Sequence, residues 1–314
     1  MRTPACLIAV VLSVASIPAA RAQSSAFIVA YDDLYSINLT SRQATYIGSF
    51  GNYGNQPFGL LKGLAFNPER TLYAISDSLS QKPVVTLNTA TGAASFVAPL
   101  NVGSGSGQFN SHDFGATFTC TGQMWVSSAA TNRLWKVDAA RGTTEQVGAS
   151  TGATITGIVA RGETLYGAGG RGSNNFYRID TATGAAELIG PLGIPNSTWI
   201  HSVSMSFDAQ GRLWAVINYV PPAPGSTSVA EWADLARINR TTGAATVLGT
   251  ISGPDRLRYV GVNGLAVGPA PCTSTPGGDG GTDGPVTLPV RAPWGLLALG
   301  LGLLALAARR LRNA

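Results

Sequence analysis

The sequence predicts an all-β repeat fold, because one 15-residue pattern recurs five times along its 314 residues. In each copy an Asn or Asp ends an apolar segment, a turn residue follows four positions later, and a Gly or Ala follows six positions after that. The Asn or Asp residues are Asn38, Asn88, Asp138, Asp180 and Asn239, which are separated by 50, 50, 42 and 59 residues. A period of this size is typical of architectures that repeat one supersecondary unit.

Each copy is predicted to form a β-hairpin. The Asn or Asp side chain accepts hydrogen bonds from backbone N–H groups ahead of it, and Gly takes the left-handed position before the returning strand. The first copy has Arg42 at that position, so it must accept this conformation at some cost or use a different turn. A second hairpin precedes four of the copies, as in GLAFNPERTLYAI at 63–75. Two hairpins per repeat make a four-stranded antiparallel sheet, which is the blade of a β-propeller.

The two ends of the repeat array predict how the ring closes. The first copy is preceded only by AFIVAYDD at 26–33 and therefore lacks an innermost strand, whereas YVGVNGLAVGP at 259–269 repeats the innermost-strand pattern and then stops. Pairing this last strand with the first three strands removes two exposed sheet edges. We therefore predict a single propeller of five four-stranded blades with 3+1 strand closure. Four blades with a separate cap is the alternative.

The N-terminal segment is typical of an export signal. Residues 1–22 contain a basic residue, an apolar run and Ala20-Arg21-Ala22, which predicts a signal peptide removed by signal peptidase, and 23–271 is the predicted propeller. The mature chain keeps Cys120 and Cys272, and an oxidising compartment permits a disulfide between them. Two isolated thiols are the alternative.

The C-terminal segment predicts sorting to the cell surface. Residues 272–293 form a Gly- and Pro-rich linker, and 294–314 hold a 15-residue apolar run with a basic end. Such a helix spans about 22 Å, which is short for a bilayer crossing. The VTL motif at 286–288, the apolar run and the basic end together resemble the IPTL-CTERM and PEP-CTERM-like sorting signals of Gram-negative exosortase substrates, although Pro285 departs from that pattern. The resemblance implies transient membrane insertion and processing by an exosortase-like enzyme, and a simple tail anchor is the alternative.

Charge and motif content exclude several classes of function. Residues 23–271 contain 15 Lys or Arg against 14 Asp or Glu, so we expect no nucleic-acid partner. Gly167 to Gly172 match G-x-G-x-x-G, but no helix follows to bind a phosphate. The sequence has no C-x-x-C, H-E-x-x-H or acidic calcium loop, so we predict no metal and no cofactor. The repeats resemble those of extracytoplasmic propellers in general, which indicates fold rather than activity.

Two histidines are candidate site residues at the channel of the propeller. His112 and His201 each lie 13 residues before a Trp, so they occupy equivalent positions at the entry of two innermost strands, and Lys62 enters near the same level. We expect both His side chains to point into one funnel, which turns Asp113 away from the channel by strand alternation. A metal would need a third and a fourth ligand. Rim histidines bonded to water and backbone are the alternative.

The longest and most aromatic loops are predicted to lie on the same face as these histidines. Tyr53, Phe109, Trp199 and Trp232 are the candidate contact residues, since binding concentrates on variable loops over a rigid scaffold. They would otherwise pack the loops down. The sequence therefore predicts an exported binding module for a surface protein or glycan. The alternative is a lactonase-like or other hydrolytic or oxidoreductase propeller with its site at the channel mouth.

Overall fold

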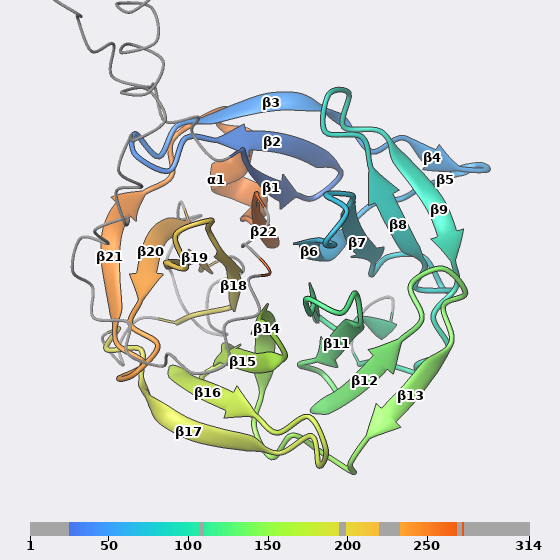
Figure 1. Cartoon of the computed structure of the whole chain (residues 1–314). Coiled ribbons are helices and arrows are strands. Elements are labelled where there is room, and N and C mark those ends of the chain that lie inside the picture. Colours follow the sequence, from blue (N-terminus) through green and yellow to red (C-terminus); the bar gives the residue numbers. More distant parts are fainter. Residues whose placement is uncertain (1–24, 107–109, 195–198, 220–232, 269–271, 273–314) are drawn as a thin grey trace, which may run out of the picture. The chain divides into compact units, whose positions relative to one another are not determined.

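The structure is a computed structural model that describes residues 25–106, 110–194, 199–219, 233–268 and 272. The chain divides into two units, 1–273 and 274–314, and the second unit lies outside the described residues, as does the predicted signal peptide. The described strands form five four-stranded sheets arranged as a ring around a central axis (Figure 1). The predicted all-β, five-bladed propeller is confirmed.

Every blade consists of four antiparallel strands, and blades I to V follow the order of the repeats. The innermost strands are β22 (Gly264–Val267), β6 (Leu61–Phe66), β10 (Phe114–Phe118), β14 (Ile155–Arg161) and β18 (Ser202–Phe207). The second strands are β1 (Ala26–Ala30), β7 (Leu72–Ser76), β11 (Met124–Ser128), β15 (Thr164–Gly169) and β19 (Leu213–Asn218). The third strands are β2 (Asp33–Ile37), β8 (Val84–Leu87), β12 (Arg133–Val137), β16 (Asn175–Ile179) and β20 (Asp234–Ile238). The outermost strands are β3 (Ala44–Ser49), β9 (Ala94–Ala98), β13 (Thr144–Val147), β17 (Ala186–Pro191) and β21 (Ala245–Thr250).

The ring closes by the predicted 3+1 arrangement. The last strand, β22, pairs antiparallel with β1, so that Leu265 lies opposite Ile28. Outside this sheet, the N–H of Ala44 donates to the carbonyl of Ser252 at 2.7 Å, which ties blade V to blade I. The buried apolar residues form five clusters, one at each junction between neighbouring blades. The core is therefore a set of inter-blade layers around the axis.

Glycines allow the innermost strands to pack closely around the axis. Gly63, Gly115, Gly157 and Gly264 occupy corresponding positions in blades II, III, IV and I. A Cβ on Gly157 would lie 2.0 Å from the carbonyl oxygen of Val203, and one on Gly115 would lie 2.8 Å from a backbone nitrogen of the next blade. The cavity at this level measures about 10 Å³. That volume is at the lower limit for one water molecule, so the waist of the channel is filled by backbone and side chains.

The repeated turn glycines also join neighbouring blades. The turn Gly92 of blade II packs on the outermost strand of blade I, where its Cβ would meet the carbonyl oxygen of Gly48 at 2.4 Å. The same contact between a turn Gly and the final Gly of the preceding repeat joins blades IV and V. Where blade V meets blade I, Arg42 takes the turn position with a φ of 62°, so it accepts the left-handed conformation. This contact explains why both glycines of the pattern recur together.

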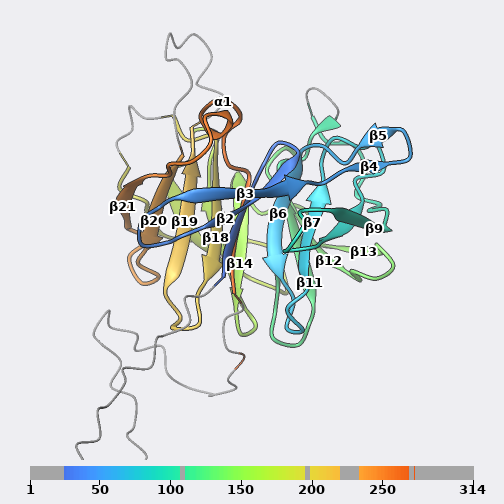
Figure 2. The same cartoon turned by 90° about the horizontal axis from the view of Figure 1, so that it is seen from above.

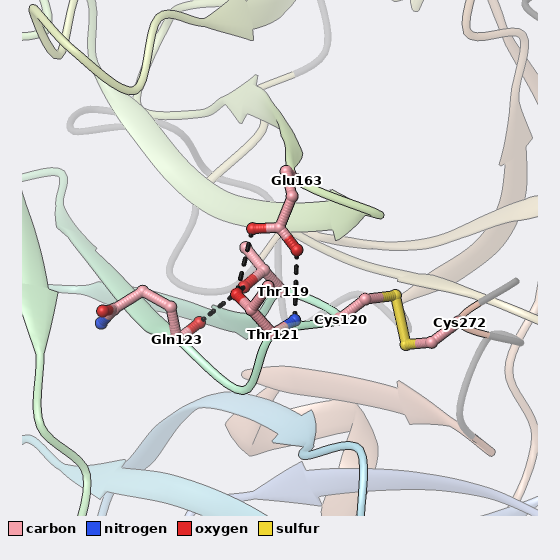
Figure 3. Close-up of a disulfide and its surroundings, with 6 residues drawn as sticks. All are labelled: Thr119, Cys120, Thr121, Gln123, Glu163 and Cys272. Carbon is pink, nitrogen blue, oxygen red and sulfur yellow. Dashed lines mark hydrogen bonds between the residues drawn. A yellow bond between two sulfur atoms is a disulfide. The ribbon is translucent and has the colours of Figure 1, made fainter. Parts of the chain in front are cut away.

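A disulfide lies at the end of the ring where the first and second strands of each blade are connected. Cys120, in the turn between β10 and β11, is bonded to Cys272, which follows β22, with 5.3 Å between their Cα atoms (Figure 3). Thr121 bonds Glu163 of blade IV through its N–H and its hydroxyl, both at 3.1 Å (Figure 3). Cys272 also lines a cavity of about 60 Å³ that residues of all five innermost strands surround. The disulfide thus borders the cavity at this end of the channel.

Candidate functional site

The opposite end of the ring carries the long connections and is called the loop face here. It includes the connections from outermost strands to the next innermost strands and the turns between second and third strands. The hairpin of β4 (Asn52–Tyr53) and β5 (Gln56–Pro57) and the helix α1 (Arg256–Val260) both lie on this face (Figure 2). Five innermost strands enter the channel from it, so any side chain just ahead of these strands lies near the axis.

The structure corrects the expected orientation of His112. Its side chain is fully buried and stacks on Phe114, with 4.7 Å between the ring centroids. Its Nδ1 lies 3.1 Å from the Ser128 hydroxyl and its Nε2 lies 3.3 Å from the Gly103 carbonyl oxygen. Burial lowers the pKa of His112. The prediction that His112 faces the funnel is therefore wrong, because packing and hydrogen bonds hold its ring beneath the loop.

Asp113 takes the place that had been expected for His112. Lys62 Nζ lies 3.1 Å from Asp113 Oδ1, and Arg171 forms an ion pair with Oδ2 of the same carboxylate. Burial raises the pKa of Asp113, but Lys62 and Arg171 lower it by more, to about 2. Strand alternation from His112 does not apply at this point, because Asp113 leaves the extended conformation. The carboxylate is ionised at neutral pH and carries one negative charge to the axis.

A buried carboxylate in blade II, Asp77, holds Asp113 in place. Asp77 accepts hydrogen bonds from the backbone N–H groups of His112, at 3.0 Å, and Asp113, at 2.9 Å, and from the Ser111 hydroxyl at 2.6 Å. Lys82 Nζ lies 3.4 Å from Asp77 Oδ1. Asp113 has a φ of 47°, an uncommon conformation for a residue other than Gly, which these contacts maintain. Sequence analysis missed Asp77 because its partners lie more than 30 residues away in the next blade.

His201 lies near the same charges in blade V. Burial and the positive charges of Lys62 and Arg171 lower its pKa to about 4, against the opposing effect of Asp113. The ring is therefore neutral at physiological pH. Its backbone N–H donates to the Asn218 carbonyl at 2.8 Å, which fixes the start of β18. The effect of Lys62 on the pKa of His201 agrees with the expectation that both residues lie at the same height along the axis.

The Gly-rich segment that resembles a nucleotide motif positions Arg171 instead. The Arg171 N–H donates to the Ile200 carbonyl at 2.7 Å, and a Cβ on Gly170 would lie 2.7 Å from the His201 carbonyl oxygen. Only a glycine backbone lets this turn of blade IV approach the entry of β18 so closely. No helix follows the segment, since it leads directly into strand β16. The glycines therefore serve the contact between blades IV and V.

Together these residues form a polar ring at the channel mouth. Lys62 of blade II bonds Asn263 of blade I at 2.8 Å and pairs with Asp113 of blade III, which pairs with Arg171 of blade IV. His201 of blade V is the remaining member. Each blade thus contributes one polar side chain, and hydrogen bonds or ion pairs connect four of the five. Asn263 and Arg171 were not among the predicted site residues, although both lie beside predicted strand entries.

The aromatic candidates lie apart from the polar ring or outside the described residues. Tyr53 is 44% exposed and stacks on Phe96 of β9, with 4.5 Å between the ring centroids. Trp199 is half-buried and lies beside Gly172, next to the turn that carries Arg171. Phe109 and Trp232 fall outside the described residues. Tyr53 and Trp199 both lie in connections of the loop face. Of the two, Tyr53 is exposed and is held in place by its contact with blade II.

Two further features bear on the expected chemistry. Within the described part of the chain, no group of three or more His, Cys, Asp or Glu side chains is placed to hold a metal ion. The described residues also include no helix long and apolar enough to cross a membrane, and the apolar run at 294–308 lies outside them. The polar ring at the channel mouth consists of two cations, one carboxylate, one neutral imidazole and one amide.

Comparison with known proteins finds distant structural neighbours. No protein family model and no curated protein matches the chain. A chain of the nidogen/laminin complex is 13% identical with a TM-score of 0.49, and covers 79% of this chain and 100% of its own length. A Bacteroides caccae protein of unknown function is 10% identical, with a TM-score of 0.47 and coverages of 78% and 99%. Virginiamycin B lyase from Staphylococcus aureus, with quinupristin, is 14% identical, with a TM-score of 0.39 and coverages of 76% and 74%.

These neighbours include a protein in a complex and an enzyme. The β-propeller fold of this chain is established by its own sheet topology. The activity of this chain has to be argued from its own residues.

Proposed function

We propose that the protein is an exported binding module whose ligand docks on the loop face, over the polar ring. The observation that carries this proposal is the convergence of Lys62, Asp113, Arg171, His201 and Asn263, one from each blade, at a single end of the axis. The carboxylate is neutralised by its two cations, and such a self-paired cluster suits recognition of a ligand's polar groups. Tyr53 is exposed on the same face and offers an aromatic contact apart from the polar ring.

Export and sorting form part of this proposal. The signal-peptide pattern at 1–22 and the sorting-signal resemblance at 285–314 support delivery to the cell envelope, with an exosortase-like enzyme as processing partner. The disulfide between Cys120 and Cys272 suits an oxidising compartment. Mass spectrometry of the mature protein is expected to find Gln23 as the first residue and no peptide from 309–314. Recovery of the intact basic end would support a retained tail anchor instead.

The binding proposal is tested by comparing the two faces of the ring. Full-chain protein would be incubated with isolated cell-envelope material, and bound protein would be quantified for Tyr53→Ala and Arg171→Gln on the loop face. Lys136→Ala on β12, away from the loop-face connections, is the matched control. We expect loss of binding only for the loop-face variants, with unchanged melting curves. Equal losses for Lys136→Ala would contradict the proposed docking face.

His201 favours a second candidate, an enzyme with its site at the channel mouth. A neutral imidazole beside Lys62 and Arg171 can accept a proton while the cations stabilise a developing negative charge. A pKa of about 4 makes His201 a weak base at neutral pH, so this lactonase-like or other hydrolytic candidate ranks below the first. Turnover of a lactone and ester panel by the full chain, abolished in His201→Gln, would establish this candidate. Binding to envelope material without turnover would favour the first.

A further inference from the structure

The polar ring at the channel mouth is interrupted at His201. Contacts run from Asn263 through Lys62 and Asp113 to Arg171, and so connect blades I to IV. His201 of blade V lies between the two ends of this series in ring order, and it is coupled to Lys62, Asp113 and Arg171 through charge alone, without a hydrogen bond to its ring in the described part of the chain. His201 is half-buried, and the backbone N–H of Arg171 donates to the carbonyl of the preceding residue, Ile200, at 2.7 Å, which places His201 next to Arg171 in the ring.

The charges around this interruption favour an anion. Two cations and one carboxylate leave a net charge of +1, because His201 is neutral at physiological pH. The Lys62 and Asp113 side chains are only 5% and 6% exposed, whereas the Arg171 side chain is 33% exposed. Arg171 is thus the cation that a ligand can reach. An incoming group with a single negative charge would neutralise the cluster.

The shape of the donors selects a carboxylate among anions. A guanidinium carries five N–H donors in a planar fork, and the described contact with Asp113 uses one terminal nitrogen of Arg171. The remaining donors match the two oxygens of a planar carboxylate. A phosphate dianion would exceed the available charge of +1, and the ionised Asp113 would repel it about twice as strongly as a singly charged carboxylate.

We propose that the gap at His201 is a subsite for a carboxylate group of the ligand, held by the free donors of Arg171 and by an N–H of the His201 ring. This inference rests on the proposed binding function and names the chemical class of its ligand. The bound carboxylate completes the ring from blade IV to blade V. Ligands of this class include uronic acids, acidic peptides and free carboxylic acids.

A bound carboxylate would change the protonation of His201. Lys62 and Arg171 oppose the imidazolium form and Asp113 favours it, so an added negative charge raises the pKa of His201 from its value of about 4. By linkage, carboxylate affinity then rises as pH falls through the pKa of the complex. A rise of one pKa unit corresponds to a tenfold increase in affinity for the ionised carboxylate at pH values below both pKa values of His201, so the ligand concentration has to be counted as its ionised fraction at each pH.

The test uses the chain's two histidines as site and reference in one sample. The His201 and His112 ring resonances of the full chain would be followed by NMR during titration with sodium acetate at constant ionic strength, balanced with sodium chloride. We expect a saturable shift of His201 and a pKa increase of at least one unit. His112 should stay unchanged, because it is buried and bonded elsewhere. Acetamide, the neutral isostere, should leave both resonances unchanged.

Substitutions of Arg171 test whether binding needs the planar donor geometry of its guanidinium or only its positive charge. Arg171→Gln should abolish the acetate response, and Arg171→Lys should retain only part of it because it keeps the charge without the fork. Arg178→Gln, an exposed arginine on β16 of the same blade, should behave as wild type. An equal effect of acetate and acetamide, or a full response in Arg171→Gln, would overturn the carboxylate subsite.

The outcomes distinguish this inference from the binding proposal. If acetate is silent while Tyr53→Ala still loses envelope binding, the carboxylate subsite is wrong and the loop-face proposal stands. If neither acetate nor envelope material binds, both are wrong.

Discussion

Breaking the Cys120–Cys272 disulfide is expected to lower the free energy of unfolding by about 5 kcal/mol. The cross-link joins residues 152 positions apart, so it removes a large loop from the freedom of the unfolded chain. In the chain-entropy treatment a closed loop of this size costs the unfolded state about 17 cal/mol/K, which is about 5 kcal/mol at 25 °C. For a domain of this size the melting temperature should fall by roughly 10 to 20 °C.

The measurement compares three variants with wild type. Cys120→Ser, Cys272→Ser and the double variant would be unfolded in guanidinium chloride without reductant, and wild type would be unfolded with and without reductant. All three variants should lose the same amount of stability, because either substitution removes the whole cross-link. The denaturant dependence should also steepen in the variants, since their unfolded chain exposes more surface.

Two results would refute this reasoning. Oxidised and reduced wild type that unfold at the same denaturant concentration would show that the bond does not restrict the unfolded chain. Additive losses in the double variant would show that the two side chains act through packing rather than through their bond. Thiol labelling of the unfolded wild type, before and after reduction, confirms which state was measured.

The remaining predictions concern the waist of the channel and the two histidines. Gly157→Ala should lower the free energy of unfolding by more than about 3 kcal/mol in a denaturation experiment, because its Cβ would lie 2.0 Å from the Val203 carbonyl oxygen. Gly268→Ala, whose Cβ would have its nearest neighbour at 3.4 Å, should lower it by less than about 1 kcal/mol. His112→Ala should destabilise by about 2 to 4 kcal/mol as a buried, stacked and hydrogen-bonded ring, while His201→Ala should melt close to wild type. The pKa of His201 in the folded protein is about 4, below its ordinary value of 6.5, so the unfolded chain takes up the proton at higher pH than the folded protein does. The free energy of unfolding should therefore fall by up to about 3 kcal/mol as the pH drops from about 6.5 towards 4. His201→Gln should remove that part of the pH dependence, and an unchanged pH profile in this variant would contradict the assignment.

The ring architecture was predictable because its determinants are local and repeated. The Asn or Asp before each turn bonds backbone N–H groups two and three residues ahead, as Asp180 bonds those of Ala182 at 2.7 Å and Thr183 at 3.0 Å. Each repeat therefore specifies its own hairpin. The closure followed from the need to pair the edges of an incomplete first blade.

The site was only partly predictable because its determinants lie in neighbouring blades. Asp113 faces the axis in a left-handed conformation that Asp77 stabilises across 36 residues, and nothing near Asp113 in the sequence indicates this contact. A period-two alternation from His112 cannot decide which of two adjacent residues points inward when the backbone leaves the extended region between them. The Gly-rich turn before β16 was recognised as unsuited to nucleotides. Its contact with the entry of β18 could not be predicted, because it forms between two blades that come together only in the folded ring.

The structure of the channel limits how a ligand reaches the polar ring. At one end Cys272, bonded to blade III, borders a cavity of about 60 Å³. At the waist, where the glycines bring the innermost strands together, the cavity measures about 10 Å³, which is the space of about one water molecule. A ligand that contacts Arg171 or His201 must therefore approach from the loop face. Substitutions at the disulfide should lower the stability of the domain and leave ligand affinity unchanged. Arg171→Gln should lower ligand affinity with a smaller effect on stability. Stabilisation of the ring and binding of the ligand would then lie at opposite ends of one channel.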